Sequence, residues 1–387
     1  MRSDRPVPEA APGWLVSPRF DAAFVLGPVW VAGLVALAIP RGTPLPAWGW
    51  VALVLGVDVA HVWSTLYRTY LDPEELGRRP LLYALAPAVA LIGGGALMAA
   101  APGWYWTALA YLAAFHFVRQ AVGIGVLYRA RSGRPTRDRA GRAERAATWA
   151  VTLGPLWWWH TALPQPFAWF VDGDFVSIPA WTLGPAIGLA AATVGWHVVE
   201  RLRERRVAVA SDLWLAGTAV VWIGGIAIAR SDAAFTVSNV VAHGVPYVAL
   251  VWWTARRKWA IAGRGAIHPA LFEPLAGPLV VLGLVALAYG EEALWDALVW
   301  QDHPTLFGWL TTRLDLPGAG EGAVGPVTSA AIVVLSVPQV THYLLDGFVW
   351  KLGPTNPDLR RWLGLDGARS GGTRSDPRPR SPAGTRS

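Results

Sequence analysis

Four histidines stand in apolar stretches of the sequence, and they are the residues best suited to chemistry. His61 lies in VDVAHVWSTLYRTY, His116 in AAFHFVRQ, His243 in SNVVAHGVPY and His342 in PQVTHYLLDGFVWK. Ionisable residues are costly within a membrane span, so each of them indicates a functional site. The chain has no cysteine, so any metal must be held by imidazole and carboxylate groups. The sequence therefore predicts a metal site formed by these four histidines.

Two carboxylates accompany these histidines at helical spacing. Asp58 precedes His61 by three residues, and Asp346 follows His342 by four, so each pair shares one face of a helix. A metal-bound imidazole usually donates its second nitrogen to a carboxylate, an amide or a carbonyl. Asp58 and Asp346 are therefore predicted as catalytic residues, with direct coordination of the metal as the alternative.

Arg119 is the only lysine or arginine placed well inside a predicted span. We expect it to pair with Asp58 or Asp346, and binding of an anionic head group is the alternative. It is the third predicted catalytic residue. His197, one helical turn from Glu200, is a candidate for a fifth metal ligand.

Other interpretations of the histidines remain open at this point. They could form a proton relay with Asp58, Asp346 and Arg119, as in a proton-coupled transporter. A pair of them on facing helices could be the axial ligands of a haem. They could also hold helices together by hydrogen bonds alone, as in a scaffold component of a membrane assembly.

The elements that must position these residues are membrane-spanning helices. The 387 residues are 53% hydrophobic and 15% charged, where soluble domains carry about 25% charged residues. A span needs about 20 apolar residues. Ten segments qualify, which predicts an all-α, polytopic integral membrane helix bundle. They are residues 22–40, 46–67, 81–101, 104–128, 147–163, 178–199, 208–229, 234–255, 271–290 and 324–350.

The positive charges predict the orientation of the bundle. If the N-terminus is cytoplasmic, only Arg41, Arg230 and Arg313 of the 33 lysines and arginines fall in outward connections. Cytoplasmic loops carry the excess of such residues, so both termini are predicted to be cytoplasmic. The net charge of +7 is then explained by loops at a lipid surface, and no nucleic-acid partner is expected.

The predicted organisation has three parts. Residues 1–21 form a cytoplasmic N-terminal segment without the features of a removable signal peptide, and residues 22–350 form the transmembrane domain. Residues 351–387 form a basic cytoplasmic tail, expected to be disordered from about residue 366. The outward connection 291–323 is expected to hold a short interfacial helix. The protein is predicted to reside in a bacterial cytoplasmic membrane.

Several segments resemble known membrane proteins. HVWSTLYRTY, FHFVRQ, AHGVPY and THYLLDGFVWK resemble those of an uncharacterised group of bacterial multi-span membrane proteins, and this resemblance implies no activity. AFHF around His116 and THYLLD around His342 show a weaker similarity to the Brp/Blh-type carotene oxygenases. In that family, histidines from several membrane helices hold an iron that cleaves a carotenoid with dioxygen.

That similarity implies iron at His61, His116, His243 and His342. This sequence departs from the family at Arg119 and Gln120, where an acidic residue would be more natural, and in its extra spans. A carotenoid is therefore not inferred as the substrate. Zinc and copper suit the same ligands. The leading hypothesis is a membrane-embedded oxidoreductase with non-haem iron, acting on a lipid-like or isoprenoid substrate from the surrounding lipid and served by an electron donor.

Overall fold

The protein is a bundle of helices. The computed structural model describes residues 11–165, 173–205, 208–272, 277–314, 325–354 and 356–365, and every regular element in these ranges is helical. The prediction of an all-α bundle is confirmed. The predicted disorder from about residue 366 lies outside the described residues.

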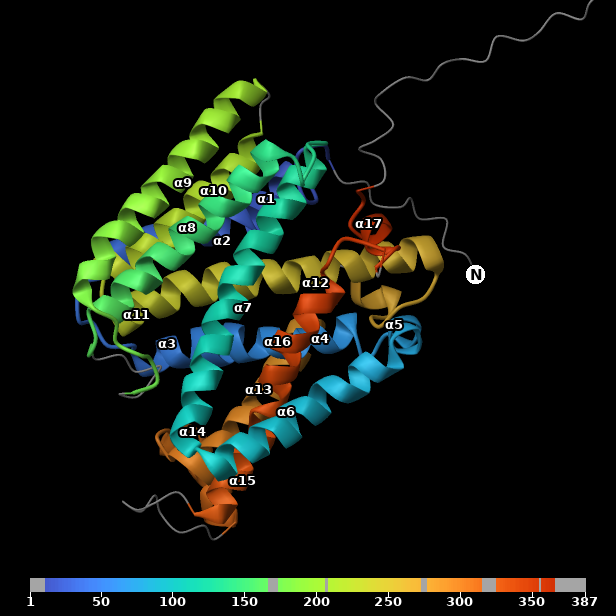
Figure 1. Ribbon diagram of the computed structural model, residues 1–387. Coiled ribbons are helices and arrows are strands. Elements are labelled where there is room, and N and C mark those ends of the chain that lie inside the picture. Colours follow the sequence, from blue (N-terminus) through green and yellow to red (C-terminus); the bar gives the residue numbers. More distant parts are fainter. Residues whose placement is uncertain are drawn as a thin grey trace, which may run out of the picture.

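Nine helical stretches among the described residues are long and apolar enough to cross a membrane. Most consist of two or three consecutive elements (Figure 1). They are α1 and α2 (Pro18–Phe24, Leu26–Ala38); α3, η1 and α4 (Ala47–Gly49, Trp50–Val59, Ala60–Arg68); α6 (Pro80–Ala100); α7 (Pro102–Arg131); η2 and α9 (Ala180–Thr182, Leu183–Glu204); α10 and η3 (Val209–Trp222, Ile223–Ile228); α11, η4 and α12 (Asp232–Phe235, Thr236–Val240, Val241–Ala262); α13 and η6 (Gly277–Trp295, Asp296–Trp300); and α15 and α16 (Pro326–Leu335, Val337–Val349).

The remaining predicted span, 147–163, corresponds to the helix α8 (Arg139–Thr161). Its first turns carry Arg139, Arg142, Glu144 and Arg145, so its composition falls short of that of a membrane span. It nevertheless packs along α9 and α10 (Figure 1). Nine helices rather than ten thus qualify by length and composition, because the helix begins well before its apolar half.

Shorter helices occupy the connections. They are α5 (Pro73–Arg78), η5 (Pro269–Phe272), α14 (Pro304–Arg313) and α17 (Leu359–Trp362). A short helix, α14, lies within the connection predicted at 291–323, whereas residues 291–300 continue the preceding helical stretch of α13 and η6. Pro304 opens α14 at the first helical position, where a missing N–H costs nothing.

Both described ends of the chain meet at one end of the bundle. Near the end of α7, the Arg131 guanidinium donates hydrogen bonds to the carbonyl oxygens of Trp14, Ala11 and Gly364. The connections 132–138 and 263–268 and the helices α5 and α17 also lie at this end (Figure 1). We call it the basic end, because each of these segments carries at least one arginine. The opposite end, with α3, α11 and α14, is the far end.

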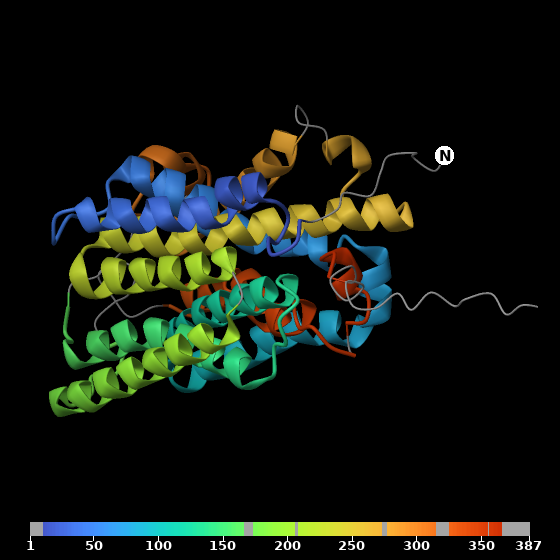
Figure 2. The ribbon, with the colours of Figure 1, turned by 90° about the horizontal axis from the view of Figure 1, so that it is seen from above.

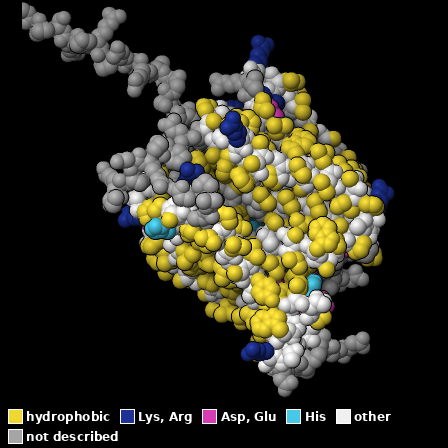
Figure 3. Space-filling model, turned by 180° about the vertical axis from the view of Figure 1, so that it is seen from behind, with side chains coloured by type: hydrophobic (Ala, Val, Ile, Leu, Met, Phe, Trp, Pro, Cys, Tyr) yellow, Lys and Arg dark blue, Asp and Glu magenta, His cyan; other side chains and the backbone are white. Residues whose placement is uncertain are grey.

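Seen from above, the helices form successive rows (Figure 2). The row of α1 and α2 packs on α12 and on α10, and α10 packs on α8, which in turn packs on α9. The α9 helix forms the margin, and its Leu189 and Leu202 are 70% and 73% exposed. Apolar side chains cover most of the face in Figure 3, with Lys and Arg at its margins. Such a surface suits contact with lipid.

Four helical stretches contain a π-helical segment: η1, η3, η4 and η6. A π-helical turn widens the helix and is frequent at functional sites. Asp58 lies in η1 just before His61, and Asn239 lies in η4 just before His243.

Candidate metal centre

The four predicted histidines meet in the interior of the bundle. His61 comes from α4, His116 from α7, His243 from α12 and His342 from α16, and none is more than 5% exposed. One ligand atom from each lies within 4.8 Å of the other three. The Nε2 atoms of His61 and His243 are 3.1 Å apart, those of His243 and His116 are 3.2 Å apart, and those of His116 and His342 are 3.0 Å apart.

Hydrogen bonds between the imidazoles cannot account for this arrangement. Each ring nitrogen offers one site in the ring plane, either a proton or a lone pair. The Nε2 atoms of His243 and His116 each take part in two of the three contacts. At most two of the three contacts can therefore be hydrogen bonds, and the third would set nitrogens against each other. A cation between the four nitrogens would satisfy all of them.

The spacing fits coordination of one metal ion. Four nitrogens about 2.1 Å from an ion lie about 3.0 Å apart at the corners of a square and about 3.4 Å apart in a tetrahedron. The three observed distances, 3.0 to 3.2 Å, lie within that range. Iron, zinc and copper are all bound by imidazole, so the geometry does not select among them.

A haem does not fit these histidines. Two axial nitrogens lie on opposite faces of the macrocycle, about 4 Å apart, and the pyrrole nitrogens surround the iron between them. Here all four imidazole nitrogens lie within 4.8 Å of one another. This close convergence leaves no room for a macrocycle between two of them in the arrangement described, and it suits a single ion better than a bis-histidine haem.

A chain of hydrogen bonds orients His342. The Tyr247 hydroxyl donates to Oδ1 of Asp346 at 2.6 Å, so its oxygen can only accept from Thr65, whose Oγ1 lies 3.0 Å away. The Thr65 hydroxyl oxygen then accepts from Nδ1 of His342 at 2.6 Å. With the proton on Nδ1, Nε2 of His342 presents its lone pair to the cluster. This is the kind of partner that fixes the tautomer of a metal ligand.

Asp346 also lies beside the cluster itself. Its Oδ2 is 3.8 Å from Nε2 of His116 and 3.9 Å from Nε2 of His342. The predicted proximity of Asp346 to the histidines is thus observed. The carboxylate can act on a group bound at the cluster, and a small movement would bring it into coordination.

Asp58 lies on the other side of the cluster. Its Oδ1 is 3.7 Å from Nδ1 of His61, and neither atom has a hydrogen-bond partner among the described residues. A small rotation of either side chain would form the carboxylate–histidine pair that the spacing of three residues predicts. Asp58 and Asp346 therefore flank the cluster along the direction of the helices.

Two aromatic rings cover the imidazoles. Phe117 stacks on His243 with ring centroids 3.8 Å apart and planes 7° apart, and Tyr343 stacks on His116 at 4.5 Å. The Gln339 amide donates to the Tyr343 hydroxyl at 2.7 Å. These contacts limit rotation of the imidazoles and exclude water from them.

Arg119 is the predicted site residue that the structure does not bring to the cluster. Its side chain is exposed on the surface of α7, and it forms no ion pair with Asp58 or Asp346 among the described residues. His197, the candidate fifth ligand, is buried in α9 and does not belong to the group of four.

Sequence reasoning did not assign the roles of Thr65 and Tyr247. Thr65 follows His61 by four residues, and Tyr247 follows His243 by four. The helical spacing that singled out Asp58 and Asp346 thus also places Thr65 and Tyr247 on the faces of the histidines. Only the contact of Thr65 with His342, on another helix, reveals what they do.

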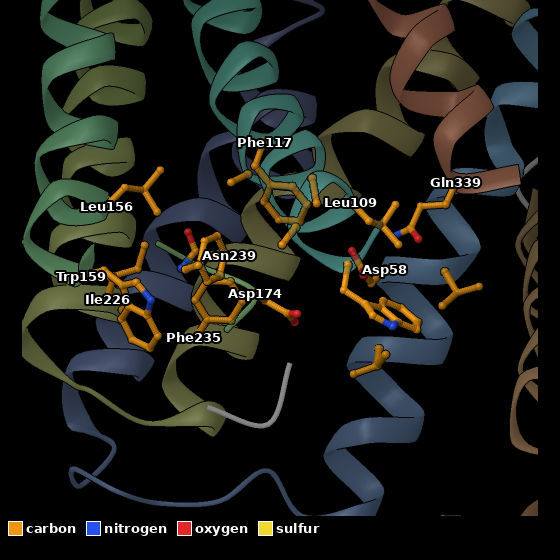
Figure 4. Close-up of a pocket in the computed structure, with 18 of the residues that line it drawn as sticks. Asp58, Leu109, Phe117, Leu156, Trp159, Asp174, Ile226, Phe235, Asn239 and Gln339 are labelled. Carbon is orange, nitrogen blue, oxygen red and sulfur yellow. The ribbon is translucent and has the colours of Figure 1, made fainter. Parts of the chain in front are cut away.

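A cavity of about 340 Å³ lies next to the cluster (Figure 4). Trp159, Ile226 and Phe235 line one side of it, and Asp58 and Gln339 lie on the other. Phe117 and Tyr343, which cover the imidazoles, belong to its wall. The volume is at the lower end of the range for small-molecule sites, about 300 to 1,000 Å³.

Comparison with known proteins provides no relative for this chain. No family model, no curated protein and no solved structure matches it. The geometry of the site is therefore the basis on which a function can be inferred.

Proposed function

We propose that this protein is a membrane-embedded, metal-dependent oxidoreductase that acts on a lipid-like substrate. The observation that carries the proposal is the convergence of four buried imidazole Nε2 atoms beside a largely apolar cavity. His61, His116, His243 and His342 are its metal ligands. Non-haem iron is the proposed ion, on the similarity of AFHF and THYLLD to the carotene oxygenases, with zinc or copper as the alternatives.

An iron or copper ion supplies dioxygen activation and one-electron chemistry when it is bound by imidazole. A dioxygenase places both oxygen atoms in the product and needs no other reductant. A monooxygenase places one there, releases the other as water, and takes two electrons from a donor. The protein supplies the dry, aromatic surroundings of the site, in which Phe117 and Tyr343 separate the imidazoles from the cavity.

Asp346 is the proposed proton-transferring residue. It is joined through Tyr247 and Thr65 to Nδ1 of His342, and its second oxygen lies near the Nε2 atoms of two ligands. A proton taken up at Asp346 is therefore held within about 4 Å of the reacting group. Asp58 lies beside His61 on the cavity side, 3.7 Å from its Nδ1, where a small rotation would let it accept a hydrogen bond from that ligand.

The proposed location is the cytoplasmic membrane of a bacterium, with the basic end in the cytoplasm. The connections at the basic end carry most of the lysines and arginines, and both described ends of the chain lie there. This distribution favours a cytoplasmic basic end. An electron donor, where one is needed, would then approach from that side.

A proton-coupled transporter is the second candidate. The observation that favours it is the position of Asp58 and Asp346 on opposite sides of the histidines, which is how a relay through the membrane would be arranged. The exposed position of Arg119 removes one of the three charged groups predicted for such a relay. Proton flux in metal-free liposomes that is lost in Asp58→Asn would favour this candidate.

The test of the oxidoreductase is incorporation of labelled oxygen. The iron-loaded protein in nanodiscs made from bacterial lipid extract is incubated with ¹⁸O₂, with an electron donor such as reduced ferredoxin in a parallel sample. Mass spectrometry should find a labelled lipid product that is absent with metal-free protein and with His342→Ala. Absence of any labelled product from protein that retains about one equivalent of iron would contradict the proposal.

A further inference from the structure

The cavity lies on the far-end side of the four histidines, and all four of their helices contribute to its wall. Each of these helices runs from the far end to the basic end, and the residue one turn before each histidine lines the cavity. These residues are Asp58, Ala113, Asn239 and Gln339. Three of the four are polar, although the positions lie inside membrane helices. The floor of the cavity is therefore polar and lies one helical turn from the proposed ion.

The cavity is also rich in carboxylates that have no counter-ion. Asp58, Glu291 and Glu292 line it, and none of them pairs with a lysine or an arginine in the described part of the chain. Glu291 accepts a hydrogen bond from Trp63 at 2.7 Å. The three carboxylates lie close enough to interact electrostatically with one another. A buried carboxylate without a cation is unfavourable, so this group attracts a positive charge.

The single arginine among the lining residues does not neutralise them. Arg230 lies at the far end, where its guanidinium stacks on Trp158 with 4.5 Å to the ring centroid. Its Nε donates to the carbonyl oxygen of Ala227. Arg230 is therefore not placed as a counter-ion of Glu291 or Glu292.

An unpartnered acceptor points to a ligand with a hydrogen-bond donor. Asn239 is 2% exposed, lines the cavity, and has no hydrogen-bond partner for its Oδ1 among the residues that the structure describes (Figure 4). A buried amide oxygen without a donor costs free energy, which a ligand N–H or O–H would recover. This observation is independent of the carboxylates.

The walls determine what kind of cation the cavity suits. Trp106, Trp295 and Trp300 line it together with Phe117, Phe235 and Tyr343. Aromatic faces attract organic cations and exclude the water that an inorganic ion would retain. The π-helical segments η1, η3, η4 and η6 all contribute lining residues, so the space is built into four of the helical stretches.

We propose that this cavity binds an apolar molecule that carries a protonated amine, with Glu291 and Glu292 as counter-ions and Asn239 as a hydrogen-bond acceptor. Fatty acids and other anionic lipids are excluded by the same carboxylates. The role of this molecule as the substrate rests on the proposed function, because the floor of the cavity lies one helical turn from the proposed ion. Binding of the amine does not depend on that function.

The test compares three ligands that share one apolar group. Binding of 4-phenylbutylamine, 4-phenylbutan-1-ol and 4-phenylbutanoate to the purified protein in a neutral detergent is measured by isothermal titration calorimetry. We expect the amine to bind at least about tenfold more tightly than the alcohol, and the carboxylate not to bind. Equal affinity for the amine and the alcohol would overturn the proposal.

Substitutions in the cavity test whether its carboxylates cause the preference for the amine over the alcohol. Glu291→Gln and Glu292→Gln should each weaken binding of the amine and leave that of the alcohol unchanged, whereas Asp302→Asn, an exposed acidic residue outside the cavity, should change neither. Helix content and metal content are measured on every variant. A preference for the amine that survives both Glu→Gln changes would overturn the proposal, even if the metal is present.

Titration with a divalent ion tests whether an inorganic cation, rather than an amine, binds at the carboxylates. Mg²⁺ is titrated into the wild type and into the two Glu→Gln variants. We expect no saturable binding at the cavity. Binding of Mg²⁺ that is tighter than that of the amine, and lost in Glu291→Gln and Glu292→Gln, would assign an inorganic cation site and overturn the proposal.

Discussion

Two buried polar clusters in this molecule differ in whether their side chains are complementary to one another. At the basic end, Arg129 is 2% exposed and binds Glu144 at 2.8 Å, Glu204 at 2.6 Å and Asp138 at 3.1 Å. Opposite charges there satisfy one another. In the middle of the bundle, four histidines present like atoms to one another. Arg129 and its carboxylate partners neutralise one another, whereas we propose that the histidines bind an ion from outside the chain.

This difference leads us to expect a structural role for the cluster around Arg129 and a functional role for the four histidines. A buried ion pair contributes little net stability, but removal of one partner leaves an uncompensated charge. A cluster of ligands contributes to stability only when its ion is bound. Changes at the basic end should therefore alter folding, and changes at the histidines should alter metal binding.

The largest expected effect is that of removing a buried arginine. Arg129→Met should lower the free energy of unfolding by about 3 to 5 kcal/mol, because Glu144 and Glu204 lose one of their two buried arginine partners and are left to share Arg134. Arg139→Met is the matched control, since Arg139 is 64% exposed and pairs with Glu200 at 3.0 Å. It should cost less than about 1 kcal/mol. Unfolding is followed by circular dichroism in mixed micelles titrated with dodecyl sulfate, and equal losses in the two variants would remove the contrast.

A smaller effect is expected from the hydrogen-bond chain behind His342. Thr65→Val removes the acceptor of its Nδ1–H and should weaken metal binding about 10- to 100-fold. Thr69→Val is the control, because Thr69 is buried just after the end of α4 and its hydroxyl donates to the Thr65 carbonyl oxygen, with no contact to His342 among the described residues. Affinity is measured by competition with a chelator. Similar losses in the two variants would indicate a packing effect rather than orientation of the ligand.

The smallest expected effect is a pH dependence at the basic end. Burial alone would raise the pKa of Glu75, but Arg68, the Tyr83 hydroxyl, Arg78 and Arg79 hold that pKa below its usual value. A lowered pKa stabilises the fold above the pKa of the unfolded chain, about 4.5, and this contribution is lost as the pH falls through the folded value.

We therefore expect the thermal stability of the wild type to fall more steeply below about pH 4.5 than that of Glu75→Gln. The measurement is the midpoint of thermal unfolding between pH 3 and pH 7 by tryptophan fluorescence. Parallel profiles for the two proteins would show that Glu75 does not contribute.

Much of the fold follows from the sequence, because span length and apolar composition are properties of a single segment. The approximate depth of the four histidines follows as well, since all lie on helices of one direction at similar distances from basic residues. α8 shows the limit of this reasoning. The apolar pattern predicted a span at 147–163, but the helix begins at Arg139, in a charged segment that the pattern does not include.

The features that sequence could not predict depend on how helices are rotated and spaced. Arg119 is three residues from His116 yet is exposed, because α7 turns only part of its surface toward the bundle. The bond between Thr65 and His342 joins residues 277 positions apart. The π-helical segments around the cavity have no simple periodic signal in the sequence.

The metal content of the purified protein tests the central claim most directly. Wild-type protein is prepared without chelators and measured by inductively coupled plasma mass spectrometry beside His116→Ala, His342→Ala and His160→Ala, the last being a histidine outside the cluster. We predict about one equivalent of a transition metal in the wild type and in His160→Ala, and its loss in the other two folded variants. A wild type that stays metal-free after incubation with iron, zinc and copper, or variants that retain the wild-type content, would contradict the assignment of the four histidines as a metal centre.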